Sequence, residues 1–230
     1  MVEIDASGKE LKKVNREIKT ALVKGKPVNV KNAEKCYGLA SGLRGGTVKI
    51  VGDVNDYVGT VNSGGEIIVE GNVKNFLGDN MISGKIMVIG NAGFGAGMYC
   101  YGGKMFIKGN AGDFTGTMNK GATIVIGGDV GNDVATYMAN GEIIILGDAG
   151  MKLGNYIIRG SVFLRGKAKS LGNNMKEGRV TEKDDTRLKK LLKENGFNVD
   201  PTMLKKYVPK TDKPFYKDKS GDLWEGWARR

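Results

Sequence analysis

Histidine is absent from the 230 residues of the chain, while cysteine and proline are scarce, with two and four residues. The lack of histidine removes the commonest general base and the commonest metal ligand, so it excludes Ser-His and Cys-His nucleophiles. Cys36 and Cys100 are too few for a disulfide framework or a cysteine-based zinc site. We expect each to be a small buried side chain in a reducing cytoplasm.

Long apolar runs are missing as well. No segment approaches the 18 consecutive apolar residues of a membrane span, and the first residues lack the basic and apolar regions of a signal peptide. The sequence therefore predicts a cytoplasmic protein without a membrane partner. The net charge of +11 arises in the two flanks, while residues 41–164 are nearly neutral. A nucleic-acid partner is not expected, because its basic stripe would normally lie on the folded middle.

Glycine, by contrast, is abundant at 37 residues, and its spacing dominates the sequence. One set recurs at a single constant interval, and each member is preceded by aliphatic or Met residues two and four positions earlier. Such internal periodicity is typical of repeat architectures. The glycines of this set are predicted to form structural turns: Gly52, Gly71, Gly90, Gly109, Gly128, Gly147 and Gly166.

The apolar alternation before each glycine predicts a short strand with one face inward. A single coil cannot bury that face alone, whereas stacked coils bury a continuous column. The prediction is an all-β fold, a single-stranded right-handed β-solenoid (β-helix) of seven to eight 19-residue coils. An Asp or Asn follows most of the turn glycines, as expected of turn-forming side chains.

Short α-helices are predicted on both sides of the solenoid. Residues 1–27 form an N-terminal capping helix segment with a capping box at Ser7–Glu10, and residues 28–176 form the solenoid. Residues 177–208 form a helical cap that begins at Thr181 with Asp184. A second short helix is expected from Pro201 through Tyr207. Residues 209–230 are predicted to be a basic extended tail.

A search of the repeat for chemistry finds little. Gly95 and Gly97 lie in a G-x-G string, but the string recurs within a β repeat rather than in a βαβ unit. Glu66 and Glu70 share one strand face, yet roughly 13 Å separates them, too far for a glycosidase pair. Asp129 and Asp148 stack in adjacent coils, and we expect them to cap turns, with Lys167 on the next coil.

Apolar side chains also recur on the outward face of the strands, three residues before each turn glycine. Two interpretations fit this row: a terminal helix lies over it, or a partner subunit does. Two tryptophans in the basic tail support the second interpretation if the tail docks, and disorder of the tail is the alternative. The predicted partner interface comprises Ile68, Met87, Phe106, Ile144, Phe163, Trp224 and Trp227.

The segments GGEIIVEGNVKNFLGDNM (64–81) and GGKMFIKGNAGDFTGTM (102–118) carry a resemblance. They resemble the GXGXG domain that closes the large subunit of glutamate synthase, and the order of elements looks most like the stand-alone subunit of split, archaeal-type enzymes. The resemblance implies a non-catalytic scaffold. Its partners would be amidotransferase and FMN-domain subunits, with FMN and iron–sulfur bound there and no cofactor bound by this chain.

No catalytic residue carries over from the family, because Val2 stands where an amidotransferase needs cysteine and no cysteine cluster exists. The same module is also found in a subunit of formylmethanofuran dehydrogenase, which is the alternative scaffold role. A carbohydrate-active solenoid enzyme is an alternative of another class, and so is nucleic-acid binding through the flanks. The oligomeric state stays open, including a homo-oligomer.

Overall fold

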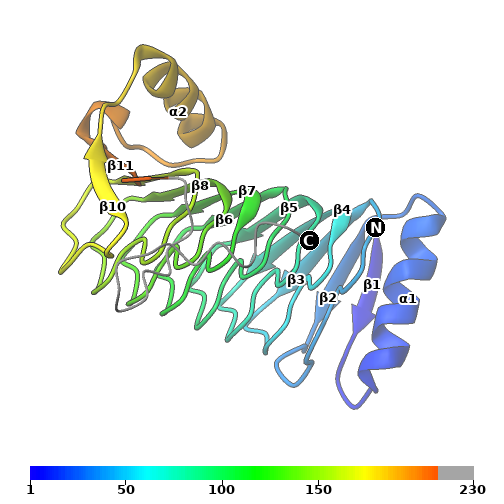
Figure 1. Cartoon of the computed structure of the whole chain (residues 1–230). Helices are drawn as coiled ribbons and strands as arrows, with labels where there is room; N and C mark the ends of the chain where they lie inside the picture. Colours follow the sequence, from blue (N-terminus) through cyan, green and yellow to red (C-terminus); the bar gives the residue numbers. More distant parts are fainter. Residues whose placement is uncertain (212–230) are drawn as a thin grey trace, which may run out of the picture.

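A computed structural model describes residues 1–211 of the chain. They form a β-solenoid of about seven turns with a helix at each side, as predicted (Figure 1). The coils share one 11-stranded sheet in the order β1-β2-β3-β4-β5-β6-β7-β8-β9-β11-β10. The elements are β1 (Val2–Asp5), α1 (Leu11–Val23), β2 (Val28–Lys31), β3 (Thr47–Val51), β4 (Ser63–Glu70), β5 (Ser83–Val88), β6 (Lys104–Ile107), β7 (Lys120–Ile126), β8 (Asn140–Ile145), β9 (Ser161–Leu164), β10 (Met175–Gly178), α2 (Glu182–Glu194), a 3-10 turn η1 (Pro201–Met203) and β11 (Lys205–Pro209).

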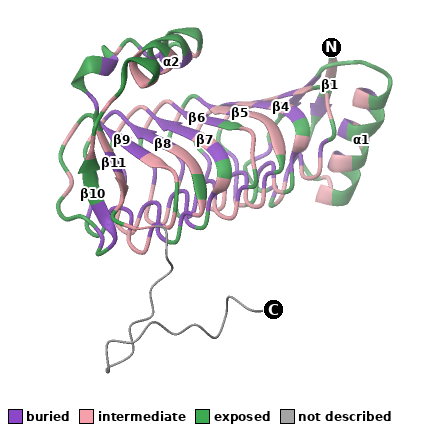
Figure 2. Cartoon of the chain, turned by 45° about the horizontal axis from the view of Figure 1, so that its top comes forward, coloured by how far each residue is buried: buried purple, intermediate pink, exposed green. Residues whose placement is uncertain are grey.

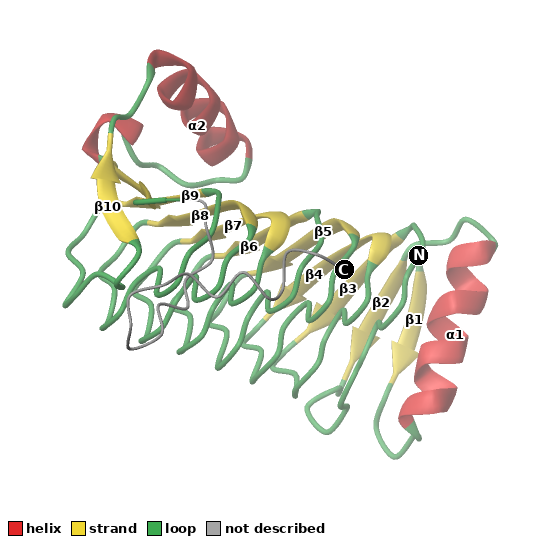
Figure 3. Cartoon of the chain, viewed as in Figure 1, coloured by secondary structure: helices red, strands yellow, loops and turns green. Residues whose placement is uncertain are grey.

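The strands from β1 to β9 are parallel and keep the register that the repeat predicts. Val48 faces Ile67, which in turn faces Ile86, so equivalent residues of successive coils lie side by side. These inward side chains are fully buried. A second buried column runs along a shorter side of each coil, through isolated bridges such as Val54 with Val73. Figure 3 shows the strands stacked coil on coil. Both aliphatic columns belong to one hydrophobic core that extends through this stack.

The turn glycines are needed mainly because neighbouring coils approach closely. A methyl group added to Gly147 would lie 2.6 Å from the carbonyl oxygen of Gly128 and closer still to Asp129 Oδ1. Gly52 differs, since its φ of +94° is itself unfavourable for other residues. Close approach thus explains the later glycines of the set, and backbone conformation explains the first.

Side chains after the turn glycines form a ladder along the stack. Asp129 Oδ1 accepts the backbone N–H of Asp148 at 2.7 Å, and Asp148 Oδ1 accepts that of Lys167 at 2.7 Å. The same bond recurs from Asp53 onward, each time to the equivalent residue of the next coil. Turn capping by Asp129 and Asp148 is therefore confirmed. Each rung fixes the position of one coil on the next.

The corner of each coil holds a feature that the sequence did not predict. Three alternate residues have positive φ, for example Tyr57 at 64°, Gly59 at 69° and Val61 at 55°. The triplet repeats in every coil, and its outer members include Phe, Tyr, Met and Val side chains. Such side chains rarely adopt this conformation. The stacked hydrogen bonds of the neighbouring coils hold them there.

The flanking elements agree with the sequence only in part. Thr181 and Asp184 form the predicted capping box of α2. The capping box predicted at Ser7–Glu10 is wrong. Glu10 is itself the N-cap residue of α1, and its side chain forms no capping hydrogen bond. The helix predicted from Pro201 through Tyr207 is also wrong, because η1 ends at Met203 and the following residues form β11. β11 pairs antiparallel with both β9 and β10, and this long-range pairing overrides the local preference.

Candidate functional site

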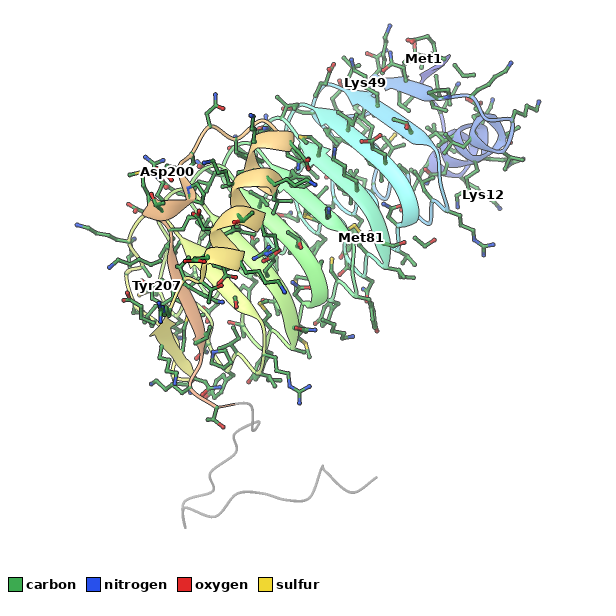
Figure 4. All side chains as sticks on the ribbon, turned by 90° about the horizontal axis from the view of Figure 1, so that it is seen from above. Met1, Lys12, Lys49, Met81, Asp200 and Tyr207 are labelled. Carbon is green, nitrogen blue, oxygen red and sulfur yellow. The ribbon has the colours of Figure 1, made fainter. Side chains whose placement is uncertain are left out.

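One outward row of the sheet is the best candidate for an interaction site. Its members lie in register on successive strands, and we call them the outer sheet face: Lys49, Ile68, Met87, Phe106, Val125, Ile144 and Phe163. Viewed from above, α2 lies over the strands of the C-terminal half, whereas the strand around Lys49 lies open (Figure 4). The face therefore divides into a covered half and an open half.

The covered half forms a second hydrophobic core with the C-terminal cap. Phe106, Ile144 and Phe163 are at most 1 % exposed. They belong to one cluster with residues of α2 and the segment after it: Leu188, Leu191, Leu192, Phe197 and Leu204. For these three residues the helix-cover interpretation holds. Their assignment to a partner interface is wrong, because the chain's own helix buries them.

Polar contacts fix the C-terminal cap over the covered half. Arg187 of α2 reaches Glu142 of β8, with 2.6 Å between Nη1 and Oε1. Lys206 of β11 binds Asp184, with 2.9 Å between Nζ and Oδ2. Lys108 donates to the carbonyls of Asn195 and Gly196 at the end of α2. These contacts tie the start and the end of the helix to different coils.

Asp184 is the most perturbed carboxyl of the cap. Burial opposes its charged form, but hydrogen bonds from Lys206 and from the Thr181 backbone and hydroxyl outweigh burial, lowering the pKa of Asp184 to about 2. The carboxylate is thus charged at neutral pH and serves both the capping box and the contact to β11. Its bonds to Thr181 and Lys206 hold the cap together.

The open half has no covering element among residues 1–211. Ile68 is half-buried, and Ile89 is 51 % exposed. Met87, also half-buried, lies at the boundary, because it packs against the covered core. Two ion pairs border these side chains: Lys49 Nζ lies 2.8 Å from Glu70 Oε1, and Lys85 Nζ lies 3.5 Å from Glu66 Oε1. Figure 2 shows this part of the sheet as a mixture of partly buried and exposed residues. The open half is an apolar strip between charged pairs.

The groups considered for catalysis have structural contacts. Glu66 and Glu70 each pair with a different lysine, so they do not form an acid and base couple. Burial raises the pKa of the Cys100 thiol to about 12, and burial raises that of Cys36 as well. Both thiols are therefore protonated and unreactive at neutral pH. Within residues 1–211, no group of three acidic or cysteine side chains is placed to hold a metal ion.

A column of aromatic side chains at the coil corners escaped the sequence analysis. Tyr57 and Phe76 stack with ring centroids 4.7 Å apart and planes 12° apart. Phe94 and Phe114 continue the column at 5.5 Å and 5.2 Å. The irregular spacing of Phe94 within the repeat hid the column in the sequence. Only the first pair is stacked, since Phe76 and Phe94 meet edge to face at 72° and Phe94 and Phe114 are tilted at 46°.

Two further expectations of the sequence concern the tail and membrane spans. Trp224 and Trp227, predicted to lie at the interface, fall outside the described residues. Among the described residues, no helix has the length and hydropathy that a membrane crossing requires.

Comparison with known proteins agrees with the geometry. A family model described as the GXGXG motif matches residues 13–220. The chain belongs to the GXGXG family. In its triplets of alternate positive-φ residues, Gly95 and Gly97 lie two residues apart, and Tyr99 occupies the third position. The domain occurs in glutamate synthase and related proteins. No curated protein matches the chain.

Proposed function

We propose that this GXGXG protein is a non-catalytic scaffold subunit of a glutamate synthase complex. In this role it holds amidotransferase and FMN-domain subunits in register while they convert glutamine and 2-oxoglutarate to glutamate. The observation that carries the proposal is the family match over residues 13–220, since the domain is typical of glutamate synthase-like complexes. FMN and iron–sulfur would be bound by the partners.

The use of polar side chains within the solenoid supports this role. Asp and Asn residues cap successive coils, and Asp184 anchors α2. Cys100 is held in its protonated form. The potential catalytic groups are therefore used to maintain the shape of the stack. A rigid shape is what a scaffold contributes, because it sets the distance between the subunits that bind to it.

The open half of the outer sheet face is the docking surface that we propose for a catalytic partner. Ile68 remains there as the uncovered member of the predicted interface, and Met87 lies at the boundary with the covered half. In the covered half, the same strand positions bind an amphipathic helix of the chain itself. An apolar strip bordered by Lys49–Glu70 and Lys85–Glu66 gives a partner both contact area and charged groups for orientation.

The test is affinity purification of the tagged chain from an extract of its own cells, with flavin absorbance of the eluate measured. A co-purifying FMN protein that forms glutamate from glutamine and 2-oxoglutarate supports the proposal. Ile68→Lys should reduce the recovered flavin at least about tenfold, because a charge would be buried at the interface. Val23→Lys is the matched control, since Val23 is 88 % exposed on α1.

Two outcomes would contradict this assignment. A partner with a molybdenum or tungsten pterin would indicate a formylmethanofuran dehydrogenase scaffold instead. Purification of the chain without any flavin protein, at expression levels close to natural, would refute the glutamate synthase role. If flavin is recovered equally with Ile68→Lys, the complex stands but the open half is not its docking surface.

A further inference from the structure

The hydrogen bonds between coils have a direction that leaves donors open at the N-terminal end of the stack. At the start of each coil's sheet segment, one backbone N–H donates to a carbonyl of the preceding coil. Ser63, for example, donates to Leu43 at 2.8 Å. The bond repeats with N···O distances of 2.7 to 2.8 Å from Ile82, Tyr101, Lys120, Ala139 and Ile158. Arg44 occupies this position in the first coil, and its N–H has no acceptor within residues 1–211.

A second donor opens two residues later for a different reason. Gly65 of the next coil donates its N–H to Asn62 Oδ1 at 2.9 Å, and Ala122 donates to Asn119 Oδ1 in the same way. In the first coil, Leu43 stands at the position equivalent to Asn62 and carries no acceptor. The N–H of Gly46 therefore also lacks an acceptor within the described chain, as do those of Gly103 and Gly160, where Cys100 and Ile157 stand in place of the Asn.

The helix α1 replaces the missing coil at one point but not at this one. Asn15 Oδ1 accepts the N–H of Ala40 at 2.8 Å, and Asn15 Nδ2 donates to the carbonyl of Gly38 at 2.9 Å. One helical turn later, at the open donors, α1 presents Lys19 instead. A lysine ammonium is itself only a donor. The end of the stack thus places Lys19 near two exposed residues, Arg44 and Gly46, whose N–H groups have no protein acceptor within residues 1–211.

These donors border a cavity of about 560 Å³ between α1 and the first coil. Its wall contains Lys19, Leu22 and Val23 of α1 together with residues 42–46. Lys19 Nζ reaches over the loop, since a methyl group on Gly42 would lie 3.6 Å from it. No carboxylate lines the cavity, and within residues 1–211 neither Lys19 nor Arg44 forms an ion pair. A neighbouring hollow adds Lys12, Arg16 and Lys24.

We propose that this cavity binds a phosphate group, either free phosphate or a small phosphate monoester. Phosphate oxygens would accept the N–H groups of Arg44 and Gly46 in place of the missing carbonyl and Asn side chain. The side chains of Lys19 and Arg44 would neutralise the charge of the phosphate. Backbone N–H groups combined with a lysine or arginine are the usual protein ligands of phosphate. Leu22 and Val23 provide an apolar wall for the organic part of a monoester.

The test is a ¹H–¹⁵N NMR titration of the full chain with inorganic phosphate at constant ionic strength. Saturable shifts are expected at the amides of Arg44 and Gly46. Lys19→Gln should weaken binding about tenfold, because a charge-assisted contact is lost. Lys13→Gln is the matched control: it removes the same charge from the same helix, lies outside both hollows, and should change affinity less than about twofold. Unchanged signals elsewhere show that each variant is folded.

The site is refuted if phosphate produces no saturable shift of these two amides. It is also refuted if Lys13→Gln weakens binding as much as Lys19→Gln, because the attraction is then general to the basic helix. Acetate that binds as tightly as phosphate would contradict a phosphate site and point to a carboxylate. Glycerol phosphate that binds more tightly than inorganic phosphate supports the site and identifies a monoester as ligand, whereas equal affinity supports free phosphate.

Discussion

The two halves of the outer sheet face share one backbone and differ in the side chains placed on it. Under α2 the row contains Phe106, Val125, Ile144 and Phe163, while the open half contains Lys49 and Ile68, with Met87 packed at the boundary. The strand register is the same in both halves. The repeat therefore determines where an outward side chain lies, and the C-terminal cap, which is not part of the repeat, covers only some members of the row. A solenoid can thus combine a closed region and a docking region without a change of fold.

The largest expected effect is a difference in the free energy of unfolding between a substitution in the covered half and one in the open half. Phe106→Ala should lower the free energy of unfolding by about 3–4 kcal/mol, because it leaves a cavity beneath the cap. Ile68→Ala removes a half-buried side chain and should cost less than about 1 kcal/mol. Urea unfolding followed by circular dichroism measures both. Similar losses for the two variants would show that the open half is as well packed as the covered half.

A smaller effect depends on pH and belongs to the covered half alone. The pKa of Asp184 lies at about 2 in the folded protein, below its ordinary value of 3.8. The carboxylate therefore stabilises the fold above about pH 4, and this contribution, about 1–2 kcal/mol, is lost as the pH falls towards 2. Asp184→Asn should be less stable than the wild type at pH 6 and should approach it at pH 2.5.

Glu194→Gln is the control for that experiment, because it changes a carboxyl at the exposed end of the same helix. Its difference from the wild type should stay small at both pH values. A stability gap for Asp184→Asn that persists unchanged at pH 2.5 would show that the amide disturbs the cap by its shape and not through its lost charge.

The smallest effect is expected at the charged border of the open half. Lys49 pairs with Glu70, but both side chains are more than a third exposed. Lys49→Gln should therefore change the free energy of unfolding by less than about 0.5 kcal/mol. Urea unfolding at low and at high salt checks this. A loss above about 1 kcal/mol that vanishes in salt would mean that the border pairs contribute to the fold itself.

The features that could be predicted from the sequence are those that depend on contacts between equivalent residues of adjacent coils. Val48, Ile67 and Ile86 occupy the same position of the repeat, so their burial and the ladder through Asp129 and Asp148 followed from spacing. Contacts between elements that are not part of the repeat could not be predicted from the sequence in this way. The antiparallel pairing of β11 with β9 joins Tyr207 to Val162, and no local signal distinguishes this strand from a helical turn. Nor does the row itself indicate that α2 lies over Phe106 and Phe163 but not over Ile68.

The corner conformation was hidden for a related reason. Positive φ is predicted at glycine, and the chain does place Gly59 and Gly97 there. Tyr57, Phe76 and Val61 adopt it as well, because the coils on both sides fix their backbone hydrogen bonds. Stacking thus overrides an intrinsic preference that a single coil would follow. Only the recurrence of position, and not the residue type, signals the conformation.

The ladder of Asp and Asn side chains also gives the protein an adjustable length. Every rung is the same hydrogen bond, which a backbone N–H donates to a side-chain oxygen of the equivalent residue in the preceding coil. A duplication or loss of one whole coil would join equivalent rungs and leave the pattern intact. Each such event would move α1 and α2 apart or together by one strand spacing, about 4.8 Å. The distance between the two ends of the stack can therefore change only by whole coils. Evolution can adjust the separation of the molecules that bind at the two ends in increments of one coil.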